Sequence, residues 1–143
     1  MLDNLFVYGS LMGSIDSPIA RRLRDHADFM GEAVVKGYLY DLGRYPGLIE
    51  DLQSNYLVKG HIFKMKNPET LLAILDEYEG AANPHVLNEY RRDHIKAKLN
   101  GHSIECWAYI YNLSTKGLPY IKSGNYLDYL KNNLEYQRFI DSV

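Results

Sequence analysis

The chain has 143 residues and a formal net charge of −2, with 16 lysines and arginines against 18 aspartates and glutamates. This length suits one domain with its own core, so we expect a single domain over residues 1–143, and the scattered basic residues argue against a nucleic-acid partner. A single cysteine excludes an intrachain disulfide, and no apolar run reaches the roughly 20 residues that span a bilayer. The N-terminus lacks the positive charge of a signal peptide. We therefore expect a cytoplasmic protein with no membrane partner, and the sequence leaves open whether it forms a homodimer.

The first half of the chain predicts one helix among several strands. Residues 4–9 form an apolar run, typical of a first strand, that ends at Gly9 within the sequence Tyr-Gly-Ser-Leu. Residues 17–30, "SPIARRLRDHADFM", combine a serine cap, a proline at the first helical position and apolar residues at helical spacing, so we expect a helix closed by Gly31. Strand-like segments follow at residues 32–42, 45–51 and 56–65. The glycines and prolines between them indicate a strongly bent sheet or small barrel.

The second half predicts a well-defined helix and a hairpin. Asn67-Pro68 begins a helix that Gly80 ends, with asparagine as the cap. Asn100-Gly101 joins two strand-like segments, 89–99 and 102–111, and this dipeptide is a strong hairpin signal. The tail from residue 123 is expected to end in a helix. Many strands with two or three helices, without strict alternation, indicate an α+β fold with a mostly antiparallel sheet or barrel.

One carboxylate of the helix over residues 67–80 falls on its apolar face. At about 100° per residue, Asp76 and Glu77 lie outside the apolar arc, whereas Glu79 lies within it. Burial and the negative end of the helix dipole both disfavour the charged form, which raises a carboxyl pKa toward the range of a general base. The alternative is that the helix unwinds before Gly80 and Glu79 faces water. The residues predicted to form the buried arc are Leu71, Leu72, Ile74, Leu75 and Tyr78.

The loop that follows the first strand has three interpretations. A nucleophilic serine needs glycines two positions before and after it, but Tyr8 and Met12 occupy those positions around Ser10. A phosphate-binding P-loop is unsupported because no lysine follows Gly13. What remains is either a plain turn or a loop in which Gly9 lets backbone N–H groups approach a carboxylate or an oxyanion.

Metal chemistry is not indicated. The five histidines show no metal-binding spacing, and Cys106 has no partner cysteine. We therefore expect neither a metal nor another cofactor.

An ordered set of motifs resembles a known superfamily. The segments "VYGSLM", "LYDLGRYPGL", "VKGHIFKM", "LDEYEG", "YRR", "WAYIYN" and "SGNYLDY" follow the motif order of the γ-glutamylcyclotransferase-like superfamily over nearly the whole chain. The Tyr-Gly-Ser-Leu loop is most similar to the γ-glutamylamine cyclotransferase branch. Asn125 and Tyr126 replace the Asp-Trp of small bacterial members, so this region is expected to reshape or cover one side of the pocket.

The resemblance implies a small, mixed but mostly antiparallel β-barrel with flanking helices. It also implies an enzyme that cyclises a γ-glutamyl amide to 5-oxoproline and releases an amine without a cofactor, with Glu79 as the catalytic acid and base. The alternative is a non-catalytic protein that binds a small carboxylate or amide on the same fold. By resemblance, the loop that holds the substrate comprises Tyr8, Gly9, Ser10 and Leu11. Further wall candidates, for which strand packing is an equal explanation, are Tyr45, Pro46, Tyr90 and Arg92.

Overall fold

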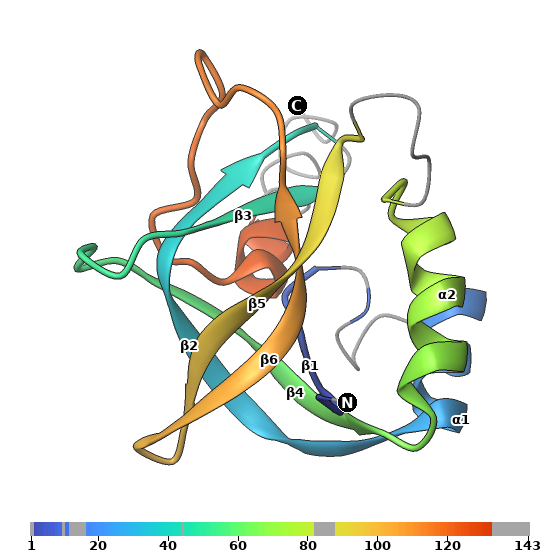
Figure 1. Ribbon diagram of the computed structural model, residues 1–143. Coiled ribbons are helices and arrows are strands. Elements are labelled where there is room, and N and C mark those ends of the chain that lie inside the picture. The colour runs from blue at the N-terminus through green and yellow to red at the C-terminus, as the bar shows by residue number, and fades with distance from the viewer. Residues whose placement is uncertain (1, 10, 12–16, 44, 82–87, 133–143) are drawn as a thin grey trace.

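The computed structural model describes residues 2–9, 11, 17–43, 45–81 and 88–132, and it confirms the predicted α+β class (Figure 1). Residues 126–132, the last that are described, are helical and follow the last strand. The other elements, in chain order, are β1 (Asn4–Val7), α1 (Pro18–His26), β2 (Ala27–Asp41), β3 (Pro46–Glu50), β4 (Leu57–Met65), α2 (Pro68–Tyr78), β5 (Tyr90–Leu99) and β6 (His102–Tyr111).

The strands close into a barrel. They are ordered β1-β4-β2-β3-β6-β5 in one sheet. A parallel pairing of β6 with β1, at Leu5 and Trp107, joins β1, β4, β2, β3 and β6 into a ring. The sixth strand, β5, lies beside β6 and also pairs with β2. Most pairings are antiparallel, while β1–β6 and β3–β6 are parallel, so the barrel is mixed as predicted. Figure 1 shows α1 and α2 together on one side of it.

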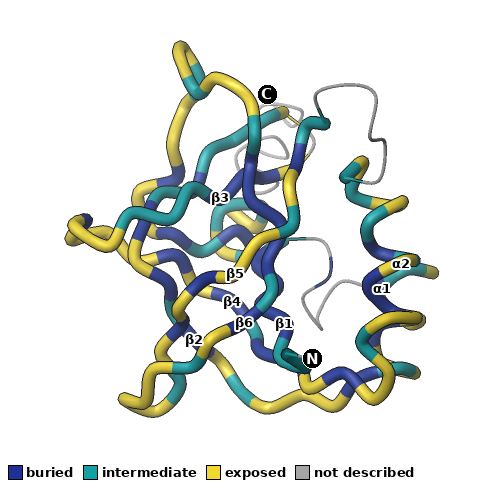
Figure 2. Tube along the Cα trace, in the orientation of Figure 1, coloured by how far each residue is buried: buried dark blue, intermediate teal, exposed yellow. Residues whose placement is uncertain are grey.

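The core fills the barrel because apolar residues alternate along its strands. In β2, Ala33, Val35 and Leu39 are buried, with more exposed residues between them. This period of two sends alternate side chains to opposite faces of a strand. Figure 2 shows buried stretches along the strands and exposed residues at the hairpin turns.

Helix α1 is shorter than predicted. It ends at His26, and β2 begins at the next residue, so residues 28–30 are extended rather than helical. The cause is tertiary: Phe29 pairs with Phe63 of β4, and their rings meet edge to face at 5.6 Å. Gly31, predicted to close the helix, instead lies at a bulge of β2 with a φ of +147°. Pairing with β4 therefore overrides the helical pattern.

The predictions for α2 and the hairpin are confirmed. The side chain of Asn67 caps α2 by accepting the N–H of Thr70. Asn100 and Gly101 both have positive φ, as a two-residue hairpin turn requires. The ladder between β5 and β6 then runs from Leu99–His102 to Tyr90–Tyr111.

The segment after β6 packs against β2 and β4. The N–H of Ile121 donates to the carbonyl of Leu39 at 2.6 Å, and the carbonyl of Gly124 accepts the N–H of Lys59 at 2.8 Å. The predicted tail helix is present over residues 126–132, and residues 133–143 lie outside the described part of the chain. Within the described residues, no helix is both long enough and apolar enough to cross a membrane.

Substitution of Gly60 tests how closely the backbones of β1 and β4 approach each other. A Cβ at this position would overlap the carbonyl oxygen of Val7 and lie 2.6 Å from Cζ of Phe6. We expect Gly60→Ala to lower the free energy of unfolding by about 3 kcal/mol, because backbone must shift to accept the methyl group. Urea denaturation measures this. The control Lys64→Ala, exposed on the same strand, should change stability by less than about 0.5 kcal/mol. Equal stabilities for the two variants would contradict the close approach.

Candidate functional site

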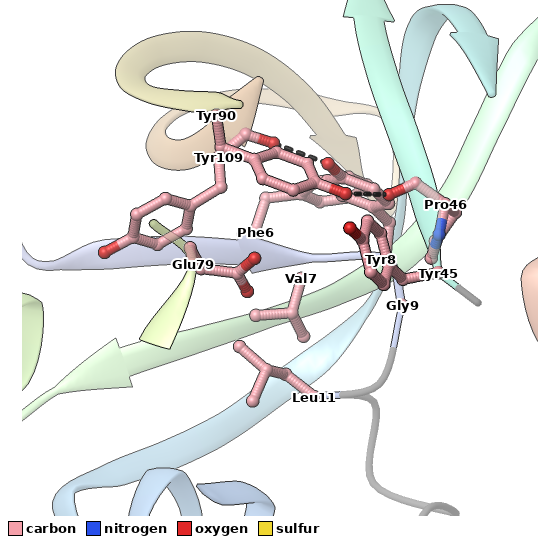
Figure 3. A pocket seen from close by; sticks show the side chains of 10 residues that line it. All are labelled: Phe6, Val7, Tyr8, Gly9, Leu11, Tyr45, Pro46, Glu79, Tyr90 and Tyr109. Carbon is pink, nitrogen blue, oxygen red and sulfur yellow. Dashed lines mark hydrogen bonds between the residues drawn. The ribbon is translucent and has the colours of Figure 1, made fainter. Parts of the chain in front are cut away.

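A cavity lies where the end of β1, the start of β3 and the C-terminus of α2 meet β5 and β6 (Figure 3). It brings together most of the residues singled out in the sequence, although they come from distant segments. The predicted residues that line it are Tyr8, Gly9, Leu11, Tyr45, Pro46, Glu79 and Tyr90. Ser10 falls outside the described residues.

Glu79 is held in place by the end of α2. It is the C-cap residue, and the following Gly80 adopts a φ of +71°. The N–H of Gly80 donates to the carbonyl of Glu77 at 3.3 Å, and the N–H of Ala81 to the carbonyl of Asp76 at 2.8 Å. This pair of bonds is a Schellman motif, which glycine favours because it has no Cβ. The helix thus persists to Glu79, whose carboxylate points into the cavity rather than to solvent (Figure 3).

The environment of Glu79 favours its neutral form. Among the described residues, none donates a hydrogen bond to its carboxylate. Burial raises the pKa of Glu79 from 4.5 to about 7, and the negative charge of Glu89 adds to the rise. A carboxyl group with this pKa both accepts and donates protons near neutral pH.

The tyrosines of the wall have their hydroxyl groups engaged elsewhere. The hydroxyl of Tyr8 donates to the carbonyl of Tyr109 at 2.5 Å and accepts the N–H of Leu48 at 3.2 Å. The hydroxyl of Tyr90 donates to the carbonyl of Pro46 at 2.6 Å. Burial is the main cause that raises the pKa of Tyr8 and of Tyr90 above the ordinary tyrosine value, so both stay protonated at neutral pH. These side chains therefore form rigid walls.

Gly9 and Leu11, which follow β1, both line the cavity. A Cβ at Gly9 would lie 3.0 Å from Cγ of Pro46, so glycine allows the loop to pack closely on β3. In the part of the chain that the structure describes, nothing accepts a hydrogen bond from the N–H of Gly9 or Leu11. Free N–H groups at a cavity can bind a carboxylate or a developing oxyanion.

Arg92, a predicted wall candidate, is not among the residues that line this cavity. Its guanidinium pairs with the carboxylate of Asp76 through bonds of 2.8 and 3.2 Å, and lies 4.5 Å from the ring centre of Trp107. Asp76 also accepts the hydroxyl of Tyr109 at 2.7 Å. It is therefore partly buried and paired, whereas the helical wheel placed it in solvent.

The face of α2 that contacts the barrel is rotated from the predicted one. Tyr78, predicted to be buried, is 49% exposed, while Leu72 and Leu75 are buried. Arg92 of β5 and Tyr109 of β6 bind Asp76, so the side of the helix that carries Asp76 faces the barrel. The true contact arc runs from Leu71 to Asp76 on the wheel, and Glu79 lies near its middle.

Comparison with known proteins identifies the family. A family model described as "Gamma-glutamyl cyclotransferase, AIG2-like" matches residues 5–128. The chain belongs to this family. A gamma-glutamylcyclotransferase family protein from Citrobacter rodentium is 32% identical over 125 residues, which cover 87% of this chain and 95% of the relative.

Solved structures agree on the fold. Protein ytfP from Escherichia coli is 31% identical, with a TM-score of 0.62 over 87% of this chain and 96% of that one. An AIG2-like protein from Mus musculus has a TM-score of 0.66 over 85% of this chain and 87% of that one, at 22% identity. The predicted superfamily and barrel are thus confirmed.

Three lining residues of this family member were not singled out in the sequence: Phe6, Val7 and Tyr109. Tyr109 lies within "WAYIYN", and the hairpin register that places it opposite Arg92 could have indicated it. Asn125 and Tyr126 are not among the described lining residues, because their segment packs against β2 and β4 instead. Within the described ranges, no group of three or more histidines, cysteines or acids could hold a metal ion.

The raised pKa of Glu79 predicts a pH dependence of stability. The unfolded chain loses this proton near pH 4.5 and the folded chain near pH 7. Between these values the folded state binds more protons, so the free energy of unfolding falls as pH rises, by up to about 1.4 kcal/mol per pH unit. The total loss through pH 7 is about 3 kcal/mol. Urea denaturation across pH 4 to 8 measures it. Glu79→Gln should remove this component, and an identical pH dependence in that variant would contradict the assignment.

The ion pair that anchors α2 can be tested with a double-mutant cycle. The side chains of Arg92 and Asp76 are only 26% and 20% exposed. We expect Asp76→Ala and Arg92→Ala each to lower the free energy of unfolding, with a coupling energy of about 1 to 2 kcal/mol. The exposed pair Arg91 and Asp93, at 3.5 Å, serves as the control and should couple by less than about 0.5 kcal/mol. Equal coupling in the two pairs would show that Asp76 does not anchor the helix.

Proposed function

We propose that this protein is a γ-glutamylcyclotransferase-type enzyme, which converts a γ-glutamyl amide to 5-oxoproline and releases an amine. The observation that carries the proposal is the buried carboxyl group of Glu79, which has a pKa of about 7 and lines the same cavity as Gly9 and Leu11. Membership of the family supports the same reaction.

The reaction needs one group that is first a base and then an acid. In the proposed mechanism, Glu79 accepts a proton from the α-ammonium group of the substrate. The freed amine attacks the γ-carbonyl carbon of the same molecule, and a new C–N bond closes the five-membered ring. Collapse of the tetrahedral intermediate breaks the bond to the leaving amine, which takes the proton held by Glu79. The ring nitrogen gives up its second proton by the same route, so it ends as an amide N–H and the amine leaves as an ammonium ion. No water is consumed.

The remaining task of the protein is to shape the substrate. Because nucleophile and carbonyl belong to one molecule, holding them in near-attack geometry removes much of the barrier. The N–H groups of Gly9 and Leu11 would receive the oxyanion of the intermediate, a contribution of roughly 2.7 to 4 kcal/mol per donor in well-studied hydrolases. The rings of Tyr8 and Tyr90 would exclude water from the reacting atoms.

Replacement of Glu79 tests the mechanism. The purified protein is incubated with γ-glutamyl amines, γ-glutamyl amino acids and glutathione, and 5-oxoproline is measured. We expect turnover of at least one substrate class, with a rate that rises with pH through about 7 as Glu79 becomes the base. Glu79→Gln should lower the rate by about 10²- to 10⁴-fold without loss of folding. The control Glu77→Gln, exposed on the same helix, should retain activity.

Two outcomes would overturn the proposal. Undiminished turnover by Glu79→Gln would exclude Glu79 as the acid and base. If no substrate yields 5-oxoproline but γ-glutamyl compounds raise the melting temperature, the protein is a non-catalytic binder of small amides or carboxylates instead.

A further inference from the structure

The outer surface of the barrel carries four lysines on three neighbouring strands, which we term the lysine face. On this surface, Val34 of β2 pairs with Lys59 of β4 on one side and with Lys98 of β5 on the other. The adjacent Val35 and Ala97 are buried in the core, so the alternating lysines point outward. The lysine face consists of Lys36, Lys59, Lys96 and Lys98, all exposed.

In the described part of the chain, none of these four ammonium groups forms an ion pair. No carboxylate within the described chain lies within 4.0 Å of any of the four ammonium groups. The carboxylate of Glu50 accepts the backbone N–H of Lys96 at 3.0 Å rather than pairing with its ammonium group. Like charges on neighbouring strands repel and destabilise a sheet. In a protein of net charge −2, such a cluster costs folding energy that a negatively charged partner would recover.

The lysine face is also hollowed and partly apolar. A groove over Val34 is lined by Lys36, Lys96 and Lys98 together with Leu52 and Leu57. These two leucines are 52% and 43% exposed. A second hollow continues past Val34 and reaches Lys59, where Glu32 and Asp128 line the wall without pairing with the lysines. A ligand that presents acidic and apolar groups together would complement this lining.

We propose that the lysine face binds an extended, acidic polypeptide segment in which acidic and apolar residues alternate. Successive outward lysines on β5 are two residues apart, a spacing of about 7 Å that matches alternate side chains of an extended peptide. Lysine ammonium groups suit carboxylates, and leucines in the groove receive the intervening side chains.

Other anionic partners fit less well. A membrane surface would not enter a concave groove. Among the described residues, those that line the groove over Val34 include no aromatic ring to stack on a base and no arginine to bind phosphate in bidentate fashion. The lysine face is also separate from the cavity, because Lys96 lies six residues along β5 from Tyr90, about 20 Å in an extended strand. The inference therefore does not depend on the proposed reaction.

A peptide-binding experiment tests the proposal. The probe is a fluorescein-labelled peptide of alternating glutamate and leucine residues, and binding is followed by fluorescence anisotropy. The wild-type protein should bind it with an affinity that falls as salt is added. The double variant Lys36→Glu and Lys98→Glu should bind at least tenfold more weakly. The matched control, Lys64→Glu with Lys116→Glu, changes net charge equally at exposed sites and should lose less than twofold.

Thermal stability separates lost binding from lost folding. Lys98→Glu changes an exposed side chain that has no ion pair, so its melting temperature should stay close to that of the wild type while peptide affinity falls. Formation of 5-oxoproline should be unchanged. Absence of binding by the wild type at low salt, or equal losses in the two double variants, would overturn the proposal. Preference for phosphatidylserine vesicles or a single-stranded oligonucleotide over the peptide would also overturn it.

Discussion

The candidate site depends on how the C-terminus of α2 is fastened to the barrel. Asp76 receives two bonds from Arg92 on β5 and one from Tyr109 on β6. One turn later, the Schellman motif at Gly80 ends the helix with Glu79 still directed inward. The ion pair thus sets the rotation of the helix, and the motif sets its length. Both are needed to place a carboxylate opposite the Gly9 loop.

Burial of the Glu79 carboxyl group lowers the stability of the folded protein at high pH, and the same burial raises the pKa that the proposed chemistry uses. A carboxyl group without a donor among the described residues is more easily buried neutral than charged, which is why the pKa of Glu79 rises to about 7. The same burial that weakens folding at high pH keeps a proton available near neutrality. The wall tyrosines differ, because Tyr8 and Tyr90 donate to backbone carbonyls and are thereby locked as neutral rings.

Local patterns predicted the elements well where the interactions are local. The cap at Asn67, the stop at Gly80 and the Asn100-Gly101 turn depend on bonds within a few residues, and the structure has each of them. The predictions failed where a distant strand decided the outcome. Residues 28–30 follow a helical pattern but pair with β4, and the periodicity of α2 did not reveal that Asp76 has partners on β5 and β6.

The sequence by itself determined the class of fold, the family resemblance and the unusual position of Glu79 on an apolar helix face, because periodicity and motif order are properties of the chain alone. Only the tertiary structure decided which candidates share a cavity. Tyr90 lines it, whereas Arg92, two residues along the same strand, pairs with Asp76. Only the barrel register gathers Lys36, Lys59 and Lys98 into one face. These arrangements arise from pairing between distant strands, which spacing along the chain does not encode.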